Sequence, residues 1–545
     1  MNTKSWISVR LFLAIFSFVI VALTLVTTVV PFVSPTDYGL AGKLPLFYWA
    51  GLFSVVSLLF LGRKSKKWLS VVFVLSILYL FVVPSIVQEN AVLLGVSYPA
   101  AEGQQITEVG KLPEDRYSIY KYHNFPGFLF FNTILTSITG IPLALICRIA
   151  PPLLTALIGI IIYLIFRIKL EPSISIMGTL WFLASWWWVA GNYYSPQQLS
   201  FVFFALVFLI FTKFAYMKKS PNRALLVLLL IFSVTIIFSH AFTSMMLLAC
   251  FVPLVLIGQN RGRYIALYFV IIGFAFLILW AFPFTQWTLH STLQELPNLF
   301  SLQFGRAQLL GSLQQTVTNG FRYYTMLLSI LIFIIFISTS IFKFTKQKIS
   351  DEKFWLICMI GMALPVVVTA YGMSETIIRG FMFMLIPLSF ICVKFISKKP
   401  VLLAVLLSSL IFISVPAHYG GITVENVARS EIVGASFYLN HVPVDAAYFS
   451  MTPSPTFLMW FQSPYSIKYP HYLNILESVT NQSNMVDFQF YQYIIYSQGD
   501  VNQFLYYHGK VPIQRSDLEN FNKLYDNPFV EIYTNSTYIE VPLPG

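Results

Sequence analysis

Long apolar blocks, separated by short polar segments, dominate the chain. Each block has about 17 to 25 residues, the length that a helix needs to cross a hydrocarbon core of roughly 30 Å. The first block is longer than the apolar part of a signal peptide and no small-residue cleavage site follows it, so we count it as a span. The pattern predicts thirteen membrane-spanning helices, over residues 11–32, 46–62, 68–87, 149–166, 173–190, 197–212, 224–240, 242–258, 264–284, 323–342, 354–370, 376–393 and 400–416.

The composition agrees with this pattern. Of the 545 residues, 57% are hydrophobic and only 10% are charged, and the mean hydropathy is +0.73. A water-soluble protein of this size could not accommodate so many apolar side chains. We therefore expect an all-α polytopic membrane protein, surrounded by membrane lipid over most of its length.

Basic residues alternate between the loops and predict the orientation of the chain. The N-terminus and every second loop hold 21 of the 34 Lys and Arg residues. Since basic loops stay on the cytoplasmic side, we expect a cytoplasmic N-terminus, an extracytoplasmic C-terminal segment and a location in the cell membrane. The net charge of +12 then belongs to the cytoplasmic rim, and it does not indicate a nucleic-acid partner.

Three predicted outer segments are much longer than the other loops. Two of them interrupt a transmembrane domain over 1–416, at residues 89–149 and 285–322, and the third is an extracytoplasmic domain over 417–545. In this last segment Tyr, Asn, Gln and Ser replace the apolar runs. A small α/β domain is expected there, with a helix over 430–439 and strands over 446–450, 488–496 and 529–533.

The first long outer segment contains two candidate interfacial helices. Ser97 suits the start of a helix and Gly110 its end, and Glu102 and Ile106 would share one face at a spacing of four. A carboxylate would thus point where an apolar side chain anchors the helix. The apolar stretch 128–141 predicts a second interfacial helix or a re-entrant segment.

The cysteines do not indicate a disulfide framework or a zinc site. All four lie in or beside apolar blocks, and none is part of a CxxC or a Cys/His pattern, at Cys147, Cys250, Cys358 and Cys392.

The chain resembles the C-fold superfamily of membrane glycosyltransferases (GT-C). The shared features are the number of spans, the cytoplasmic N-terminus, the long outer loops and the outer C-terminal domain. Local segments similar to landmarks of this superfamily lie at 98–140, 192–198 (Asn-Tyr-Tyr-Ser-Pro-Gln-Gln), 239–244 (Ser-His-Ala-Phe-Thr-Ser) and 379–383 (Arg-Gly-Phe-Met-Phe). The resemblance implies transfer of a sugar from a polyprenyl-phosphate carrier to a glycan, lipid or protein acceptor at the outer face.

Such a transfer needs a carboxylate that accepts the proton of the acceptor hydroxyl. The acidic pair usual after the first span of the superfamily is absent, since the first outer loop has only Asp37. The resemblance places the acid of the family at Glu102, and Glu89 and Glu108 are the reserve candidates. The alternative for Glu102 is an ordinary solvated surface carboxylate.

A cation is also needed to hold the leaving phosphate. Arg379 lies about one turn inside a predicted span, where a charge is costly unless it is paired or faces a polar cavity. It could pair with Glu375, four residues earlier, or bind phosphate through its guanidinium. Arg322 and Arg306 are further candidates for the phosphate.

Four more residues are candidates for substrate binding. His240 could contact substrate or end its helix by bonding to a carbonyl, and His123 could orient substrate or fix its turn. Tyr194 and Gln197 could contact the sugar, or they could form only the tight turn before the sixth span.

Other functions fit parts of the pattern. A polymerase or ligase of lipid-linked glycans would use the same outer loops, and the missing acidic pair also suits a non-catalytic GT-C-like scaffold. A transporter or flippase is disfavoured because charges in the span centres are scarce. No cofactor is identified: a divalent metal would need two or more converging oxygen ligands, and the spacing pairs no second ligand with Glu102.

Overall fold

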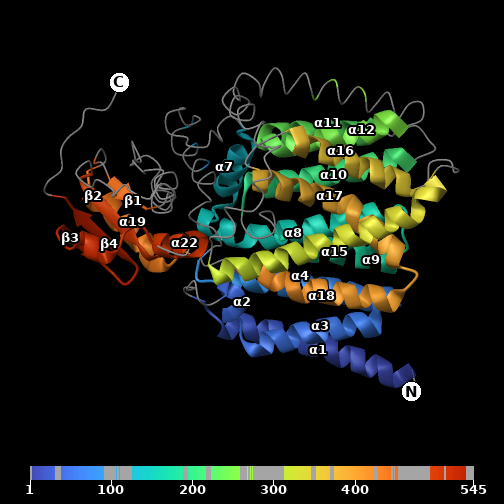
Figure 1. Ribbon diagram of the computed structural model, residues 1–545, viewed down its shortest axis with the longest axis horizontal. Coiled ribbons are helices and arrows are strands. Elements are labelled where there is room, and N and C mark those ends of the chain that lie inside the picture. The colour runs from blue at the N-terminus through green and yellow to red at the C-terminus, as the bar shows by residue number, and fades with distance from the viewer. Residues whose placement is uncertain are drawn as a thin grey trace.

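Long helices lie side by side in the computed structural model, and a small four-stranded sheet lies beyond one end of them (Figure 1). The N-terminus is at the opposite end of the bundle from this sheet. The structure describes residues 3–30, 38–90, 103, 106, 110, 125–187, 194–216, 223–257, 267, 271, 273, 312–344, 351–368, 373–421, 427–443, 446, 448–451, 491–508 and 511–535.

Within these ranges, seven helices are long and apolar enough to cross a membrane and five apolar helices are shorter. The bundle consists of α1 (Thr3–Thr27), α2 (Gly39–Lys43), α3 (Leu46–Gly62), α4 (Lys66–Ile77), η1 (Leu78–Val82), α5 (Val83–Val87), α7 (Gly127–Thr139), α8 (Leu143–Arg167), α9 (Pro172–Ser185), α10 (Pro196–Tyr216), α11 (Arg223–Ser239), α12 (Ala241–Ile257), α15 (Leu313–Phe344), α16 (Asp351–Val368), α17 (Met373–Ile396) and α18 (Pro400–Tyr419).

Twelve of the thirteen predicted spans coincide with these helices, which confirms the polytopic all-α class. The ninth, over 264–284, lies mostly outside the described residues. The stretch 128–141 forms α7, a separate short helix. Gly103 and Ile106 are helical, and Gly110 has φ 73° and donates its N–H to the Ile106 carbonyl at 2.8 Å, which confirms Gly110 as a helix end.

The third span contains a π-turn at η1, and two tyrosine hydroxyls bond to the carbonyls that it releases. Val83 donates to the carbonyl of Leu78, five residues back, so the Tyr79 carbonyl loses its helical donor; Pro84 has no N–H for the Leu80 carbonyl. The Tyr48 hydroxyl donates to the Tyr79 carbonyl at 2.8 Å, and the Tyr419 hydroxyl donates to the Leu80 carbonyl at 2.5 Å. The π-turn thereby fixes α3 and α18 to this span.

A second carbonyl that loses its helical donor, that of Arg148 in α8, also bonds to a side-chain hydroxyl. Pro152, inside α8, cannot donate to the Arg148 carbonyl, and the Ser85 hydroxyl donates to it instead at 2.7 Å. In return the Arg148 guanidinium donates to the carbonyls of Ile86 and Gln88. The ends of α5 and α8 are therefore joined by reciprocal hydrogen bonds.

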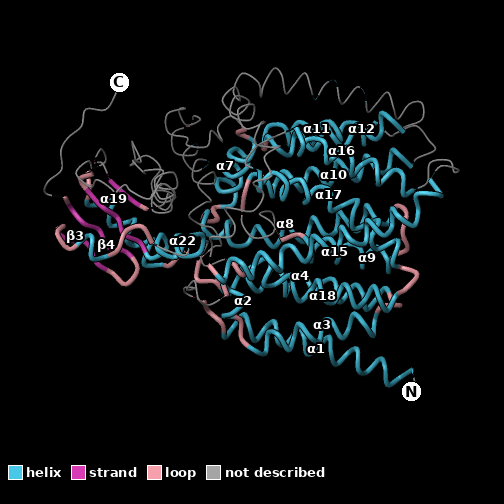
Figure 2. The backbone as a smooth tube through the Cα atoms, viewed as in Figure 1, coloured by secondary structure: helices cyan, strands magenta, loops and turns pink. Residues whose placement is uncertain are grey.

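The C-terminal segment is a small α/β unit, as predicted. Its sheet has the strand order β1-β2-β4-β3, in which β1 and β2 are parallel and the other neighbours antiparallel. Figure 2 shows the helices beside these strands. The elements are α19 (Arg429–His441), β1 (Tyr448–Ser450), β2 (Tyr493–Ser497), α22 (Gln498–His508), η10 (Arg515–Leu518), β3 (Asn522–Asp526) and β4 (Val530–Thr534).

Helix α19 and three of the strands were predicted near their observed positions, whereas α22 and β3 were not predicted. The domain division at residue 416 stays a prediction; α18 ends at Tyr419 and the next described helix begins at Arg429.

A buried carboxylate attaches α19 to the sheet. Glu431 accepts hydrogen bonds from the N–H groups of Ala428 and Gly499 and from the Ser497 hydroxyl, each at 2.9 Å. Burial raises the pKa of its carboxyl, and the three donors partly oppose that rise. A buried apolar cluster continues from α19 and the sheet to α7, α8 and α10, so the sheet packs against the end of the bundle.

The pairing of the Leu80 carbonyl can be tested with Tyr419→Phe. The variant removes one hydroxyl and leaves a buried carbonyl without a donor, so we expect a loss of roughly 1–3 kcal/mol of stability. The measurement is the thermal unfolding midpoint in detergent. Tyr38→Phe, which changes an exposed side chain, should leave the midpoint unchanged; equal midpoints for the two variants would contradict the proposed pairing.

Candidate functional site

Three helices meet around one aromatic side chain near the end of the bundle that faces the sheet. Phe383 of α17 contacts Phe201 and Phe204 of α10, with ring centroids 5.1 and 4.7 Å apart, and Phe242 of α12 at 5.9 Å. All four rings are buried. Helices α10, α12 and α17 all begin at this end of the bundle (Figure 1).

Three predicted binding residues lie just before these aromatic rings in the chain. Arg379 precedes Phe383 by one turn, Gln197 precedes Phe201 by one turn, and His240 comes immediately before α12. The Arg379 guanidinium lies close enough to His240 to act on it electrostatically. The structure thus places Gln197 and His240 at the starts of α10 and α12, and Arg379 in the second turn of α17. Helix N-termini favour anions.

His240 caps the first turn of α12. Its Nδ1 accepts the N–H of Thr243 at 3.2 Å and lies 2.9 Å from the Thr243 hydroxyl. We infer from this network that Nδ1 carries no proton, which leaves the proton on Nε2. A neutral imidazole therefore presents its Nε2–H as a donor. His240 caps the start of α12 through Nδ1, whereas one alternative from the sequence was a bond to a carbonyl at the end of a helix.

Tyr194 and Gln197 are buried, at 1% and 3% exposed, and both carry polar atoms without a hydrogen-bond partner. These atoms are the Tyr194 hydroxyl and the Gln197 Nε2. By contrast, Gln198 Nε2 donates to the Pro151 carbonyl at 3.0 Å, which attaches the start of α10 to α8. An unpaired polar atom in a bilayer protein is costly, and a bound ligand or water can pair it.

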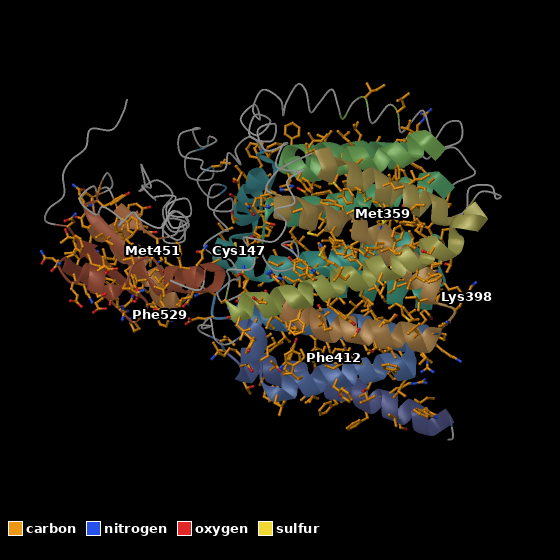
Figure 3. All side chains as sticks on the ribbon, in the orientation of Figure 1. Cys147, Met359, Lys398, Phe412, Met451 and Phe529 are labelled. Carbon is orange, nitrogen blue, oxygen red and sulfur yellow. The ribbon has the colours of Figure 1, made fainter. Side chains whose placement is uncertain are left out.

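Helix α7 covers this part of the bundle. The Phe128 ring lies 5.0 Å from the Tyr194 ring, and a Cβ added at Gly127 would come within 2.4 Å of the Ser239 hydroxyl. On the other side, the Thr133 hydroxyl donates to the Gly103 carbonyl at 2.5 Å. Residue 103, directly after Glu102 in the chain, is thereby held against α7. Figure 3 labels Cys147 at the same end of the bundle and Lys398 at the opposite end.

Asn132 of α7 is a polar residue that the sequence analysis missed. It is 1% exposed, and neither its Oδ1 nor its Nδ2 has a hydrogen-bond partner. A Cβ added at Gly103 would lie 3.1 Å from its Cβ. The available signal was the one amide side chain of α7, which shares a face with Phe128, four residues earlier.

Of the three predicted acids and His123, the structure describes only Glu89. Glu102, Glu108 and His123 lie outside the described residues, so their roles stay predictions. Glu89 lies at the junction with the sheet domain, where its Oε2 accepts the Arg429 N–H at 3.4 Å. It lines a cavity of about 540 Å³ together with residues of α19 and the β3–β4 turn. No described contact joins Glu89 to Arg379 or His240.

Arg322 lies at a different place, where it braces the end of α18. Its Nε donates to the Ala417 carbonyl at 2.9 Å, and its guanidinium lies over the Trp187 ring, 5.0 Å from the centroid. The neighbouring His418 contacts the Trp186 carbonyl through Nε2 at 2.7 Å. These contacts hold the segment after α9, and they give Arg322 a structural role that needs no phosphate.

The described residues contain no group of three or more His, Cys, Asp or Glu side chains that could hold a metal ion. Calcium and magnesium sites need several oxygen ligands that converge. The described part of the chain therefore assigns no residue to a metal.

Comparison with known proteins shows the fold. No protein-family model matches the chain, and no curated protein sequence matches it either. The crystal structure of ArnT from Cupriavidus metallidurans bound to undecaprenyl phosphate is similar, with a TM-score of 0.50 and 13% identity, over 88% of this chain and 100% of that one. The apo structure of the same protein gives a TM-score of 0.40 and 14% identity, over 87% and 99%. The chain thus has the GT-C fold that the sequence predicted.

Arg322→Lys tests the bracing role. A lysine ammonium cannot bond to the Ala417 carbonyl and also keep a planar group over Trp187, so we expect about 1–2 kcal/mol lower stability without any substrate. Thermal unfolding in detergent measures the change, and Arg429→Lys at an exposed position is the matched control. An unchanged midpoint for Arg322→Lys would favour its assignment to ligand binding instead.

Proposed function

We propose that the protein is a membrane glycosyltransferase that transfers a sugar from a polyprenyl-phosphate carrier to a cell-surface acceptor. One observation carries the proposal: Arg379, in the second turn of α17, acts electrostatically on His240 at the start of α12, and the buried amide of Gln197 lies at the start of α10. The GT-C fold supports it, and so does the undecaprenyl phosphate named with the similar ArnT structure.

The site suits a leaving phosphate. In the proposed reaction the acceptor hydroxyl oxygen attacks the anomeric carbon of the sugar, and the bond from that carbon to the phosphate oxygen breaks. The polyprenyl phosphate then gains a negative charge. The Arg379 guanidinium can bind two phosphate oxygens, the Nε2–H of His240 can donate to a third, and the helix N-termini add a favourable field.

A base must take the proton of the acceptor hydroxyl. We propose Glu102 for this role, with Glu89 and Glu108 as the alternatives. The support is indirect: Gly103, the next residue, packs against α7, whose first residue Gly127 lies against Ser239 just before His240. Glu89 lines the separate junction cavity. The carboxylate would accept the proton as the new glycosidic bond forms.

The proposed orientation places the reaction on the outer face of the cell membrane. The site and the sheet domain lie at one end of the bundle, and the N-terminus lies at the other. Lys398, in a predicted cytoplasmic loop, is also at the N-terminal end (Figure 3). Since basic loops are retained in the cytoplasm, the site end would face outward.

Arg379→Gln tests the phosphate site. The amide keeps a polar side chain but loses the charge and the two-pronged geometry, so transfer should fall by roughly 10²- to 10³-fold. The assay is transfer of label from radiolabelled polyprenyl-phosphate sugars to endogenous acceptors in membranes, at matched protein levels. Arg223→Gln, at the start of α11 and the opposite end of the bundle from His240, should keep full activity. Equal activity of the two variants would exclude Arg379 from the site.

Glu102→Gln tests the base in the same assay. Removing the proton acceptor should lower the transfer rate by about 10²-fold or more, while donor binding persists. Transfer that survives would move the base to Glu89 or Glu108. Absence of transfer in the wild type with every donor would overturn the glycosyltransferase proposal and favour a scaffold.

A further inference from the structure

Two fully buried polar side chains beside the phosphate site have no partner in the protein. Asn132 and Tyr194 are each 1% exposed, and the amide atoms of Asn132 and the hydroxyl of Tyr194 are without hydrogen bonds. They come from different helical segments, α7 and the residues just before α10. Groups of this kind are normally paired, so two of them at one place point to a ligand that pairs them.

The two side chains lie in one part of the bundle. Phe128 is one turn before Asn132, on the same face of α7, and its ring lies 5.0 Å from the ring of Tyr194. Phe128 and Tyr194 belong to a single buried cluster with Cys147 and Leu199. The rings of Phe128 and Tyr194 therefore lie among apolar side chains, which suit the apolar faces of a sugar ring.

This group differs in chemistry from the phosphate site. An amide and a phenol hydroxyl each donate and accept hydrogen bonds, as sugar hydroxyls do, whereas a phosphate only accepts. Gln198, four residues after Tyr194, bonds to α8. Gln197 lies one turn before Phe201, whose ring contacts Phe383 of α17. Asn132 and Tyr194 thus lie on one side of the start of α10, and Arg379 and His240 lie on another.

We propose that Asn132 and Tyr194 form the subsite for an uncharged sugar ring of the lipid-linked donor. The assignment rests on the proposed glycosyltransferase function, and it narrows the donor to a neutral hexose or a similar polyol. Arg379 and His240 hold the phosphate at the adjacent site. A sugar with a carboxylate or an ammonium group would bury a charge against two neutral side chains, which is unfavourable.

The test compares three lipids on the purified full chain: polyprenyl phosphate, the same lipid bearing a neutral hexose, and the same lipid bearing a hexuronic acid. A ligand that binds the folded state raises the unfolding midpoint, so titration of the midpoint gives the affinity of each lipid. For the wild type we expect the hexosyl lipid to bind at least tenfold more tightly than the bare phosphate or the uronic lipid.

Asn132→Leu and Tyr194→Phe each remove the polar atoms at nearly constant volume. Because these atoms have no hydrogen bond in the free protein, both variants should fold with an unchanged or higher midpoint without lipid. Each should lose about five- to tenfold in affinity for the hexosyl lipid and keep its affinity for bare polyprenyl phosphate. Asn440→Leu, the same exchange at an exposed position of α19, should bind all three lipids as the wild type does.

The outcomes separate the two proposals. If both variants keep wild-type affinity for the hexosyl lipid, or if the wild type prefers the uronic lipid or the bare phosphate, the sugar subsite is wrong while the lipid-phosphate function stands. If no lipid stabilises the wild type, the proposed function itself is wrong. A lower midpoint of both variants without lipid would show that the side chains are structural, which also overturns the subsite.

Discussion

Pairing of released main-chain carbonyls is the constraint on which the rest of the bundle depends. In a medium without water, a carbonyl that loses its helical donor needs another one. The π-turn and Pro84 release two carbonyls in the third span, and tyrosines of α3 and α18 bond to both. At the end of α18, Arg322 and Gln314 bond to the carbonyls of Ala417 and Gly420. Each such bond joins two helices in a fixed register, which apolar packing alone does not specify.

The same constraint separates scaffold from site. Among the described residues of the membrane helices near the sheet, the guanidinium groups of Arg148 and Arg322 bond to main-chain carbonyls. Arg379 acts electrostatically on His240, which caps the start of α12. The amide atoms of Asn132 on α7 and the Tyr194 hydroxyl before α10 have no hydrogen-bond partner. The arginines at this end of the bundle thus differ in their contacts: two fix helices through main-chain carbonyls, and the third acts on a histidine at a helix start.

Hydropathy predicted most of the fold because the thickness of the bilayer dictates the length of each apolar block. Gly110 was likewise predicted as a helix end because glycine readily adopts the left-handed conformation observed there. The π-turn was not predictable, since Leu78–Val82 is as apolar as any other part of its span and the irregularity depends on hydroxyl partners from helices distant in the sequence. Strand β3 was missed because it is largely exposed and its side chains do not alternate. For the site, the sequence supplied Arg379, His240 and Gln197 as separate candidates, but their association needs three helices that only the fold brings together.

The direction of the helices explains why a phosphate site can form at this end and not at the other. Short connections make successive spans antiparallel, so α10 and α12, separated by α11, both begin near the sheet, and α17 begins there too. Their N-termini create a positive field in a region where the positive-inside rule leaves few basic side chains. A lipid phosphate arriving at this end would therefore meet few competing cations, and a single guanidinium among aligned helix N-termini could govern where it binds. At the opposite end, the dense lysines and arginines of the loops would bind any anion with little selectivity.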